Sequence, residues 1–216
     1  MRPSAALVAV WGRAGGGGFR GWPGAFARQR VASARRYLGG VTTVRPAGPD
    51  DLPALAALAA LTFPLACPPH VTDEAKAAFI AANLTADHFA RYLDDPARDV
   101  LVAVEEGGAL AGYALLVAGE PADADVAAAI TLRPTVELSK CYVHPDHHGA
   151  GVAAALMAAS LDAAVARQAA GVWLGVNQQN ARAQRFYAKS GFSRVGVKRF
   201  LVGDRYEDDF VFERAL

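Results

Sequence analysis

The stretch VELSKCYVHPDHHGAGVAAA, residues 136–155, decides the fold of this 216-residue chain. It begins with an apolar run that predicts a buried strand, and the Ala-rich residues at its end begin a predicted helix. The loop between them contains GAGVAA, a formal match to the dinucleotide-binding fingerprint G-x-G-x-x-G/A. The loop could bind NAD, bind a different phosphate, or only connect a strand to a helix.

The surroundings of the loop disfavour a dinucleotide site. In a Rossmann unit the strand runs directly into the first glycine, and an acid about 20 residues later binds the ribose. Here the residues from His144 to His148 separate the strand from Gly149, and no acid lies between Asp162 and Asp204. The chain after Gly149 is too short for the rest of a doubly wound sheet, and no Lys-Ser or Lys-Thr pair follows to make a Walker A loop.

What remains is a site for the pyrophosphate of another ligand. Small residues let backbone N–H groups approach a phosphate closely, and the N-terminus of the 151–169 helix supplies a positive dipole end. A plain turn would explain Gly149 but not the small residues around it. His144, His147 and His148 raise the alternative of a metal site, but a cation beside a helix N-terminus is disfavoured. We therefore interpret them as solvated loop residues and expect no metal.

Charge is distributed unevenly along the chain. The formal net charge is +1, yet residues 1–49 contain only Arg among the charged residues, whereas the rest of the chain is acidic overall. An acidic body argues against nucleic acid as a partner and favours a cationic substrate. The two cysteines, Cys67 and Cys141, lack metal or disulfide spacing, which is typical of the reducing cytoplasm. No apolar run approaches the ~20 residues of a membrane span, so no membrane partner is expected.

Residues 1–40 form a Gly/Arg-rich N-terminal extension without helical or strand periodicity. Such a segment cannot bury enough surface to offset its ordering entropy, so we expect it to be disordered and dispensable. Three alternatives stay open: a targeting segment, an ordered accessory, and an extension upstream of a true start at Val41 or Val44.

The remaining residues, 41–216, predict one mixed α/β domain. Turn signals and caps divide it in the order strand, three helices, three strands, helix, strand, helix and two strands. Asp50 or Asp51 is placed to cap the first helix, and Pro53 is tolerable in its first turn. The expected strands are 41–47, two runs within 99–119, 136–143, 172–177, 192–203 and 208–216; the expected helices are 48–61, 72–84, 85–95, 149–171 and 180–191.

A second stretch, VNQQNARAQRFYAKSGF, residues 176–192, adds a family resemblance. Together the two stretches resemble the GCN5-related N-acetyltransferase (GNAT) superfamily, whose members show V-x-P-x-x-[QR]-x-x-G-x-[GA] after one strand and N-x-x-A-x-x-[FL]-Y-x-K-x-G-F after the next. The first pattern is filled by Val143, Pro145, His148, Gly151 and Ala153, and the second by Asn180, Ala183, Phe186, Tyr187, Lys189, Gly191 and Phe192. The resemblance covers residues 41–216.

The resemblance implies a mixed, mostly antiparallel sheet of six to seven strands, flanked by helices and splayed at strands 4 and 5. Acetyl-CoA would lie in that gap as co-substrate, with its pantetheine arm along the backbone of Cys141, Tyr142 and Val143 and near Asn180 and Tyr187. Its pyrophosphate would rest on the amides of His148, Gly149, Ala150, Gly151, Val152 and Ala153. The sequence departs from the pattern at His148, where Gln or Arg is usual, and at Ala150, where a basic residue is common.

The resemblance also implies the catalytic residues of a direct attack by an amine. Tyr187 matches the general acid that protonates the leaving thiolate, and Glu137 matches a general base. Tyr187 could instead only pack in the core, and Glu137 could be a solvated edge carboxylate. Strand alternation predicts that Glu137, Ser139, Cys141 and Val143 share one face. Cys141 is interpreted as a small buried hydrophobe rather than a nucleophile, and Asn180 as a helix cap, a pantetheine contact or both.

Within the superfamily, several stretches are similar to PaiA-type spermine/spermidine acetyltransferases, including ANLTADHFARYL and RFLVGDRYEDDFVFERAL. A primary amine, with a polyamine as its candidate form, is therefore the expected acceptor, and the protein is expected to be a cytoplasmic monomer or homodimer. Protein N-termini, amino acids, antibiotic amines and a non-catalytic CoA-binding module stay open as alternatives. Acids available to hold a polycation are Asp73, Glu74, Asp87, Asp94, Asp95, Glu137 and those of DRYEDD at 204–209.

Overall fold

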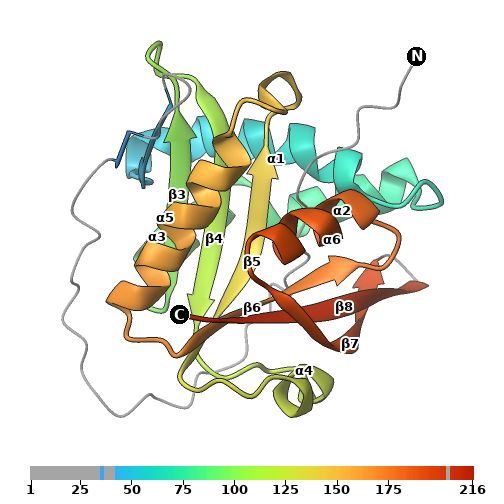
Figure 1. Cartoon of the computed structure of the whole chain (residues 1–216). Coiled ribbons are helices and arrows are strands. Elements are labelled where there is room, and N and C mark those ends of the chain that lie inside the picture. Colours follow the sequence, from blue (N-terminus) through green and yellow to red (C-terminus); the bar gives the residue numbers. More distant parts are fainter. Residues whose placement is uncertain (1–34, 37–41, 203–204) are drawn as a thin grey trace.

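The computed structural model describes residues 35–36, 42–202 and 205–216 (Figure 1). The predicted N-terminal extension, residues 1–40, lies outside these residues apart from Arg35–Arg36, so its disorder stays a prediction. The described elements form a sheet between two helical layers, and the expected order of strands and helices is confirmed. One helix, α4 (Ala124–Ala129), is additional to the elements that the sequence predicted.

The sheet has the order β1-β2-β3-β4-β5-β6-β8-β7. All of its pairings are antiparallel except the parallel pairing of β5 with β6. Without the two-residue β1, the sheet has seven strands, within the predicted range of six to seven, and β5 and β6 are its fourth and fifth strands. The strands are β1 (Arg35–Arg36), β2 (Thr43–Pro46), β3 (Arg98–Val104), β4 (Leu110–Ala118), β5 (Thr135–Val143), β6 (Gly171–Asn177), β7 (Ser193–Val202) and β8 (Arg205–Ala215).

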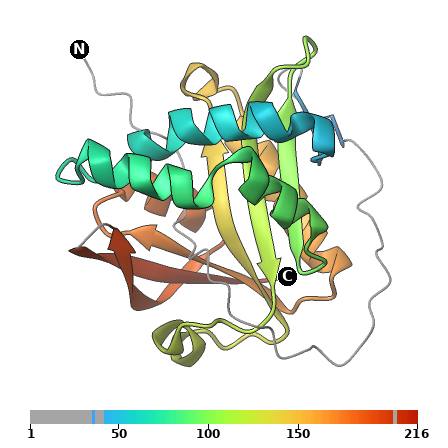
Figure 2. The ribbon, with the colours of Figure 1, turned by 180° about the vertical axis from the view of Figure 1, so that it is seen from behind.

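The helices cover the two faces of the sheet unequally. The face seen in Figure 1 carries α5 (Val152–Ala166) and α6 (Ala181–Lys189). The opposite face, seen in Figure 2, carries α1 (Leu52–Ala66), α2 (Asp73–Asn83) and α3 (Ala86–Asp94). No helix in the described ranges combines the length and apolarity needed to cross a membrane.

Local side-chain contacts explain where the first helices begin. Thr72 and Thr85 each accept a hydrogen bond from a backbone N–H in the first turn of α2 and α3, which is the role of an N-cap residue. Asp51 occupies the N-cap position of α1, but its carboxylate binds the guanidinium of Arg45 and the N–H of Gly48 instead of capping the helix. The predicted cap is therefore wrong in its bonding, because a bidentate Arg partner competes for the carboxylate.

Two apolar clusters hold the layers together. One lies under α5 and α6 and includes Leu156, Leu174 and Tyr187. The other lies under α1–α3 and includes Phe63 and Phe89. Each fully buried side chain of this size contributes roughly 1.5–3 kcal/mol relative to exposure, so both faces of the central strands are well anchored.

The divergence of β5 from β6 is the feature that makes room for a ligand. Their parallel pairing extends only from Thr135 opposite Gly171 to Glu137 opposite Trp173. Beyond this point β5 continues beside β4 while β6 pairs with β8, and Figure 1 shows the two strands separating. The splay predicted between the fourth and fifth strands is thereby confirmed.

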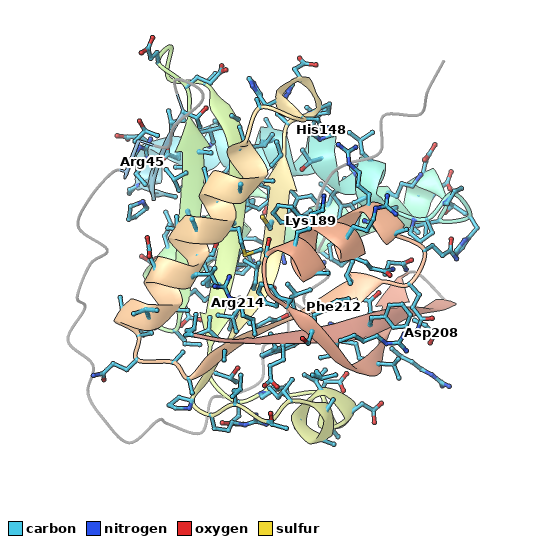
Figure 3. All side chains as sticks on the ribbon, viewed as in Figure 1. Arg45, His148, Lys189, Asp208, Phe212 and Arg214 are labelled. Carbon is cyan, nitrogen blue, oxygen red and sulfur yellow. The ribbon has the colours of Figure 1, made fainter. Side chains whose placement is uncertain are left out.

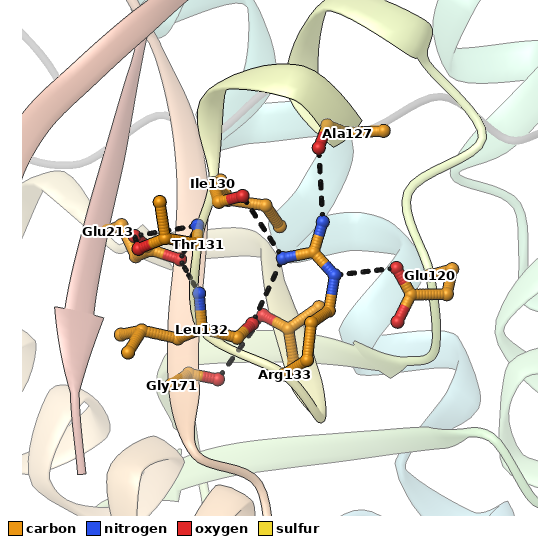
Figure 4. Close-up of polar contacts among 9 residues, drawn as sticks. Glu120, Ala127, Ile130, Thr131, Leu132, Arg133, Gly171 and Glu213 are labelled. Atoms are coloured by element: carbon orange, nitrogen blue, oxygen red, sulfur yellow. Dashed lines mark hydrogen bonds and ion pairs between the residues drawn. The ribbon is translucent and has the colours of Figure 1, made fainter.

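A polar joint fixes the start of both diverging strands (Figure 4). The Glu213 carboxylate on β8 accepts hydrogen bonds from the backbone N–H groups of Thr131 and Leu132 and from the Thr131 hydroxyl, at 2.9–3.1 Å. Arg133 binds the Glu120 carboxylate and donates to the backbone carbonyl oxygens of Ala127, Ile130 and Leu132. The segment that leads into β5 is therefore tied to β8 before the splay begins.

Candidate functional site

The loop between β5 and α5 adopts the conformation that its glycines permit. Gly149 and Gly151 have φ values of 88° and 84°, a region that other residues rarely adopt. A Cβ at either position would meet no atom within 4 Å. Glycine is therefore favoured here by the positive φ and not by crowding, and the space beside the backbone is open. A larger ligand can therefore approach this turn closely.

Several backbone N–H groups of this turn point to a phosphate site. Val152, Ala153 and Ala154 open α5, and within the described residues their N–H groups have no backbone acceptor. The positive end of the α5 dipole lies at the same place. Of the six amides that the sequence predicted for the pyrophosphate, those of His148 and Ala150 already donate to Pro145 and His147, whereas those of Gly149, Gly151, Val152 and Ala153 remain.

The edge of β5 that faces the splay adjoins this turn. Cys141, Tyr142 and Val143 pair with β4 on one side only, because β6 has left the other side. His148 lies at this end of β5 (Figure 3), where its Nε2 is 3.3 Å from the Val143 carbonyl oxygen, and desolvation lowers the pKa of its imidazole. The free edge of β5 fits the amide-bearing pantetheine of a CoA molecule, and the unpaired N–H groups of the turn fit its anionic pyrophosphate.

Tyr187 brings a hydroxyl into the apolar layer beside this edge. It lies on α6 with its side chain fully buried, and its ring contacts Phe186, Phe192 and Phe212. Phe212 lies on β8, beneath α6 in Figure 3. The Tyr187 hydroxyl oxygen has no hydrogen-bond partner among the residues that the structure describes. Desolvation raises the pKa of this phenol well above its usual value, so it stays protonated and keeps a proton that it can donate.

Asn180 and Cys141 have clear structural roles. The Asn180 side-chain oxygen accepts from the Ala183 N–H at 3.0 Å, which confirms that it caps α6. A contact of Asn180 with pantetheine stays a prediction. Cys141 is fully buried in the cluster under α5, and burial raises the pKa of its thiol to about 12. It is therefore a packing residue and no nucleophile at neutral pH.

The predicted alternation along β5 is wrong because the strand contains a bulge. Its register against β4 shifts between Leu115, which faces Lys140, and Leu116, which faces Leu138, so Ser139 is the extra residue. Leu138 and Cys141 consequently pack on the same face, under α5. Glu137 instead shares the opposite face with Lys140 and Tyr142, because directly paired residues lie on one face.

This opposite face, here called the acceptor face, carries a cluster of charges. Glu137 is half-buried at the point where the strands diverge; desolvation raises the pKa of its carboxyl, and the charges of Lys198, Lys140 and Arg98 oppose that effect. Lys198 extends from β7 to within 5.6 Å of the Trp173 ring centroid, over Gly175, where a Cβ would collide with it. The cluster therefore gathers residues from β3, β5, β6 and β7.

Sequence reasoning missed the basic members of this cluster, Lys140, Lys198 and Arg98. One signal was available: Lys140 is the single cation inside the apolar run VELSKCYV. A charged residue in the middle of a buried strand indicates a functional or electrostatic role, because burial of an unpaired charge costs free energy. The contributions of Lys198 and Arg98 depend on strand pairings distant in sequence, which no local pattern reveals.

The acids expected to hold a polycation are dispersed over the surface. Asp73, Glu74, Asp87 and Asp94 are exposed on α2 and α3, and Asp95 binds Arg98 at 2.8 Å. In the terminal DRYEDD stretch, Asp208 is exposed and Asp209 buried, while the side chains of 204–207 lie outside the described part. His144 and His147 lie near Asp146 and Glu105, and the described residues hold no group of three metal-ligating side chains.

Comparison with known proteins identifies relatives over most of the chain. The family model described as the acetyltransferase (GNAT) family matches residues 65–192. An uncharacterized N-acetyltransferase of Mycobacterium tuberculosis (strain H37Rv) is 49% identical over 166 residues, covering 77% of this chain and 98% of the relative. An uncharacterized N-acetyltransferase of Lactobacillus delbrueckii subsp. lactis is 25% identical over 167 residues, covering 77% of this chain and 92% of that protein.

Solved structures share the fold at low identity. The PaiA N-acetyltransferase of Thermoplasma acidophilum, in complex with coenzyme A, superposes with a TM-score of 0.63 at 18% identity, covering 81% of this chain and 99% of that chain. The ribosomal-protein-alanine N-acetyltransferase of Brucella melitensis gives 0.59 at 23% identity, covering 80% and 99%. With the family model and the mycobacterial relative, the splayed sheet and the glycine-containing turn lead to one conclusion: the chain belongs to the acetyltransferase (GNAT) family, and is an N-acetyltransferase with acetyl-CoA as co-substrate.

Proposed function

We propose that the protein transfers the acetyl group of acetyl-CoA directly to a primary amine, with the acceptor bound at the acceptor face. The observation that carries this proposal is the splay after Glu137 and Trp173, which opens the edge of β5 between the α5 turn and the acceptor face. The thioester would lie where the two strands part. A backbone N–H of β5 would then stabilise the oxygen that becomes negative during attack.

Two side chains have the properties that the proton transfers require. Tyr187 donates its proton to the thiolate that leaves, which suits a phenol that is buried and protonated. Glu137 lies on the acceptor face at the splay, with a carboxyl pKa raised by burial, which suits a proton acceptor for the amine. The combination of both groups favours an enzyme over a non-catalytic CoA-binding module.

The binding step is tested by thermal unfolding with candidate ligands. Acetyl-CoA should raise the melting temperature, because a ligand that binds only the folded state stabilises it, whereas NAD should not. Gly151→Val should abolish the shift, since it places a branched side chain at a φ of 84° in the phosphate-binding turn. A melting temperature that is unchanged by acetyl-CoA but raised by NAD would show that the turn belongs to a dinucleotide site instead.

The acceptor is identified by a turnover screen over polyamines, amino acids, aminoglycosides and peptides with free N-termini. A polyamine is our candidate, supported by the acidic character of the chain after residue 49 and by the likeness to PaiA-type sequences. If surface acids attract the polycation, KM for spermidine should rise steeply with salt. Turnover of peptides or amino acids, with none of any polyamine at low ionic strength, would exclude the polyamine and leave acetyl transfer intact.

A further inference from the structure

We propose that Lys140, as a neutral amine, takes the proton from the acceptor ammonium, and that Glu137 is the neighbouring carboxylate that tunes it. This inference rests on the proposed acetyl transfer and changes the assignment of its base. It gives a role to the buried basic residue that the family pattern does not explain.

The first support is position. The bulge at Ser139 turns Lys140 onto the acceptor face, opposite Leu115 of β4 and beside Tyr142 along β5. Without the bulge, Lys140 would point into the apolar cluster under α5 with Leu138. Lys140 is three residues beyond Glu137, within the segment of β5 that faces the splay instead of β6. Its amine therefore lies on the side from which an acceptor would reach the thioester.

The second support is the burial of Lys140 without a direct polar contact to its amine. Lys140 is only 4% exposed, and among the described residues Glu137 is the acid that acts on its charge, without a hydrogen bond or close ion pair to its Nζ. An ammonium in such a place costs several kcal/mol unless it is paired or gives up its proton. Arg98, by contrast, has Asp95 at 2.8 Å. Lys140 is thus a buried cation that is stabilised by becoming neutral.

The charged groups around Lys140 act in both directions. Desolvation lowers the pKa of its amine, Glu137 on β5 opposes this, and the charges of Arg98 on β3 and Lys198 on β7 add to it, so that the resulting pKa is about 8. A Lys tuned to this range can accept a proton near neutral pH, as a general base requires. Burial also raises the pKa of the Glu137 carboxyl, while the charge of Lys140 lowers it, so the two groups form one coupled pair.

The proton balance is complete with these residues. The acceptor ammonium gives one proton to the Lys140 amine, and its nitrogen lone pair then forms the bond to the thioester carbon as the carbon–sulfur bond breaks. Tyr187 gives its proton to the departing sulfur and regains one from the nitrogen that becomes an amide. Lys140 finally releases its proton to solvent, so the products are the acetamide, CoA thiol and one proton.

A pair of variants separates a base from a fixed charge. Lys140→Met removes both functions, and Lys140→Arg keeps the cation but cannot act as a base near neutral pH. We expect both to lower kcat/KM for ethylamine by about 10²–10⁴-fold at neutral pH. With trifluoroethylamine, which is already neutral there, the loss should stay within about threefold, and acetyl-CoA should still raise the melting temperature of both variants. Wild-type activity in Lys140→Arg would overturn the inference.

A titration tests Lys140 without relying on turnover. The chain has four lysines, Lys76, Lys140, Lys189 and Lys198, so ¹³Cε-lysine NMR gives few signals and Lys140→Met assigns one of them. We expect the Lys140 signal to titrate near pH 8, and to move lower in Glu137→Gln, which removes the opposing carboxylate. Titration at the ordinary lysine value would refute the inference even if amines are acetylated. Failure to acetylate any amine would instead refute the proposed function.

Discussion

The Tyr187 hydroxyl combines a stability cost with a proposed catalytic use. A buried polar group without a partner destabilises a fold by about 1–3 kcal/mol, and its phenyl counterpart would fill the same space. We therefore expect Tyr187→Phe to unfold at an equal or higher urea concentration, with kcat lowered about 10²–10⁴-fold and acetyl-CoA affinity nearly unchanged. A rate within about threefold of the wild type would reduce Tyr187 to a packing residue.

Lys140 should leave a signature in the pH dependence of stability. Its pKa is about 8 in the folded protein and 10.5 for an ordinary lysine, so between these values the unfolded chain binds more protons. The free energy of unfolding should therefore rise with pH across this interval, by about 3 kcal/mol relative to Lys140→Met. Urea unfolding of both proteins across the interval measures the difference. Parallel curves for the two proteins would contradict a depressed lysine pKa.

Among the elements, β5 shows that periodicity predicts a strand but not always which side chains share a face. The apolar run correctly predicted a strand, and the small residues after it correctly predicted the turn into a helix. The face assignment failed at Ser139, because a bulge restarts the alternation and depends on how Leu115 and Leu116 pair across β4. That partner choice is a tertiary property, so the charged acceptor face could not be assembled from the strand's own sequence.

The joint at Glu213 ties the element before β5 to β8, which gives it a testable mechanical role (Figure 4). Glu213→Gln keeps the size of the side chain but replaces one acceptor oxygen with a donor facing the N–H groups of Thr131 and Leu132. We expect a loss of about 1–3 kcal/mol in unfolding free energy and weaker acetyl-CoA binding, since the start of the splay loosens. Denaturation and calorimetric titration measure both.

Glu120→Gln is the matched control for the joint. Glu120 binds Arg133 in the same region, but its side chain is 64% exposed, and exposed ion pairs contribute only about 0–1 kcal/mol. Its stability and acetyl-CoA affinity should therefore stay near those of the wild type. Equal losses of unfolding free energy and acetyl-CoA affinity in the two variants would mean that the Glu213 contacts contribute no more than an exposed ion pair.

Across the whole molecule, the order of elements was readable because each carries its own local signals. Thr72 and Thr85 mark two helix starts, and the two glycine-containing motifs lie at the separation of one helix and one strand. The six-residue α4 was missed because so short a helix lacks a period of its own. The acids of α2 and α3 were expected to hold a polycation, but their placement depends on how these helices dock, which the sequence pattern does not reveal.

The described body should function without the N-terminal extension. Both apolar clusters consist of residues from Val44 onward, and Arg35–Arg36 only adds a two-residue strand beside β2. The β2 edge left by its removal carries Arg45 and Pro46, residue types that discourage pairing with another chain. We therefore expect a chain that starts at Val41 to stay monodisperse, to melt within a few degrees of the full chain and to keep its kcat/KM. Aggregation or lost turnover of the shortened chain, with the full chain active under the same conditions, would show that residues 1–40 contribute to the folded enzyme.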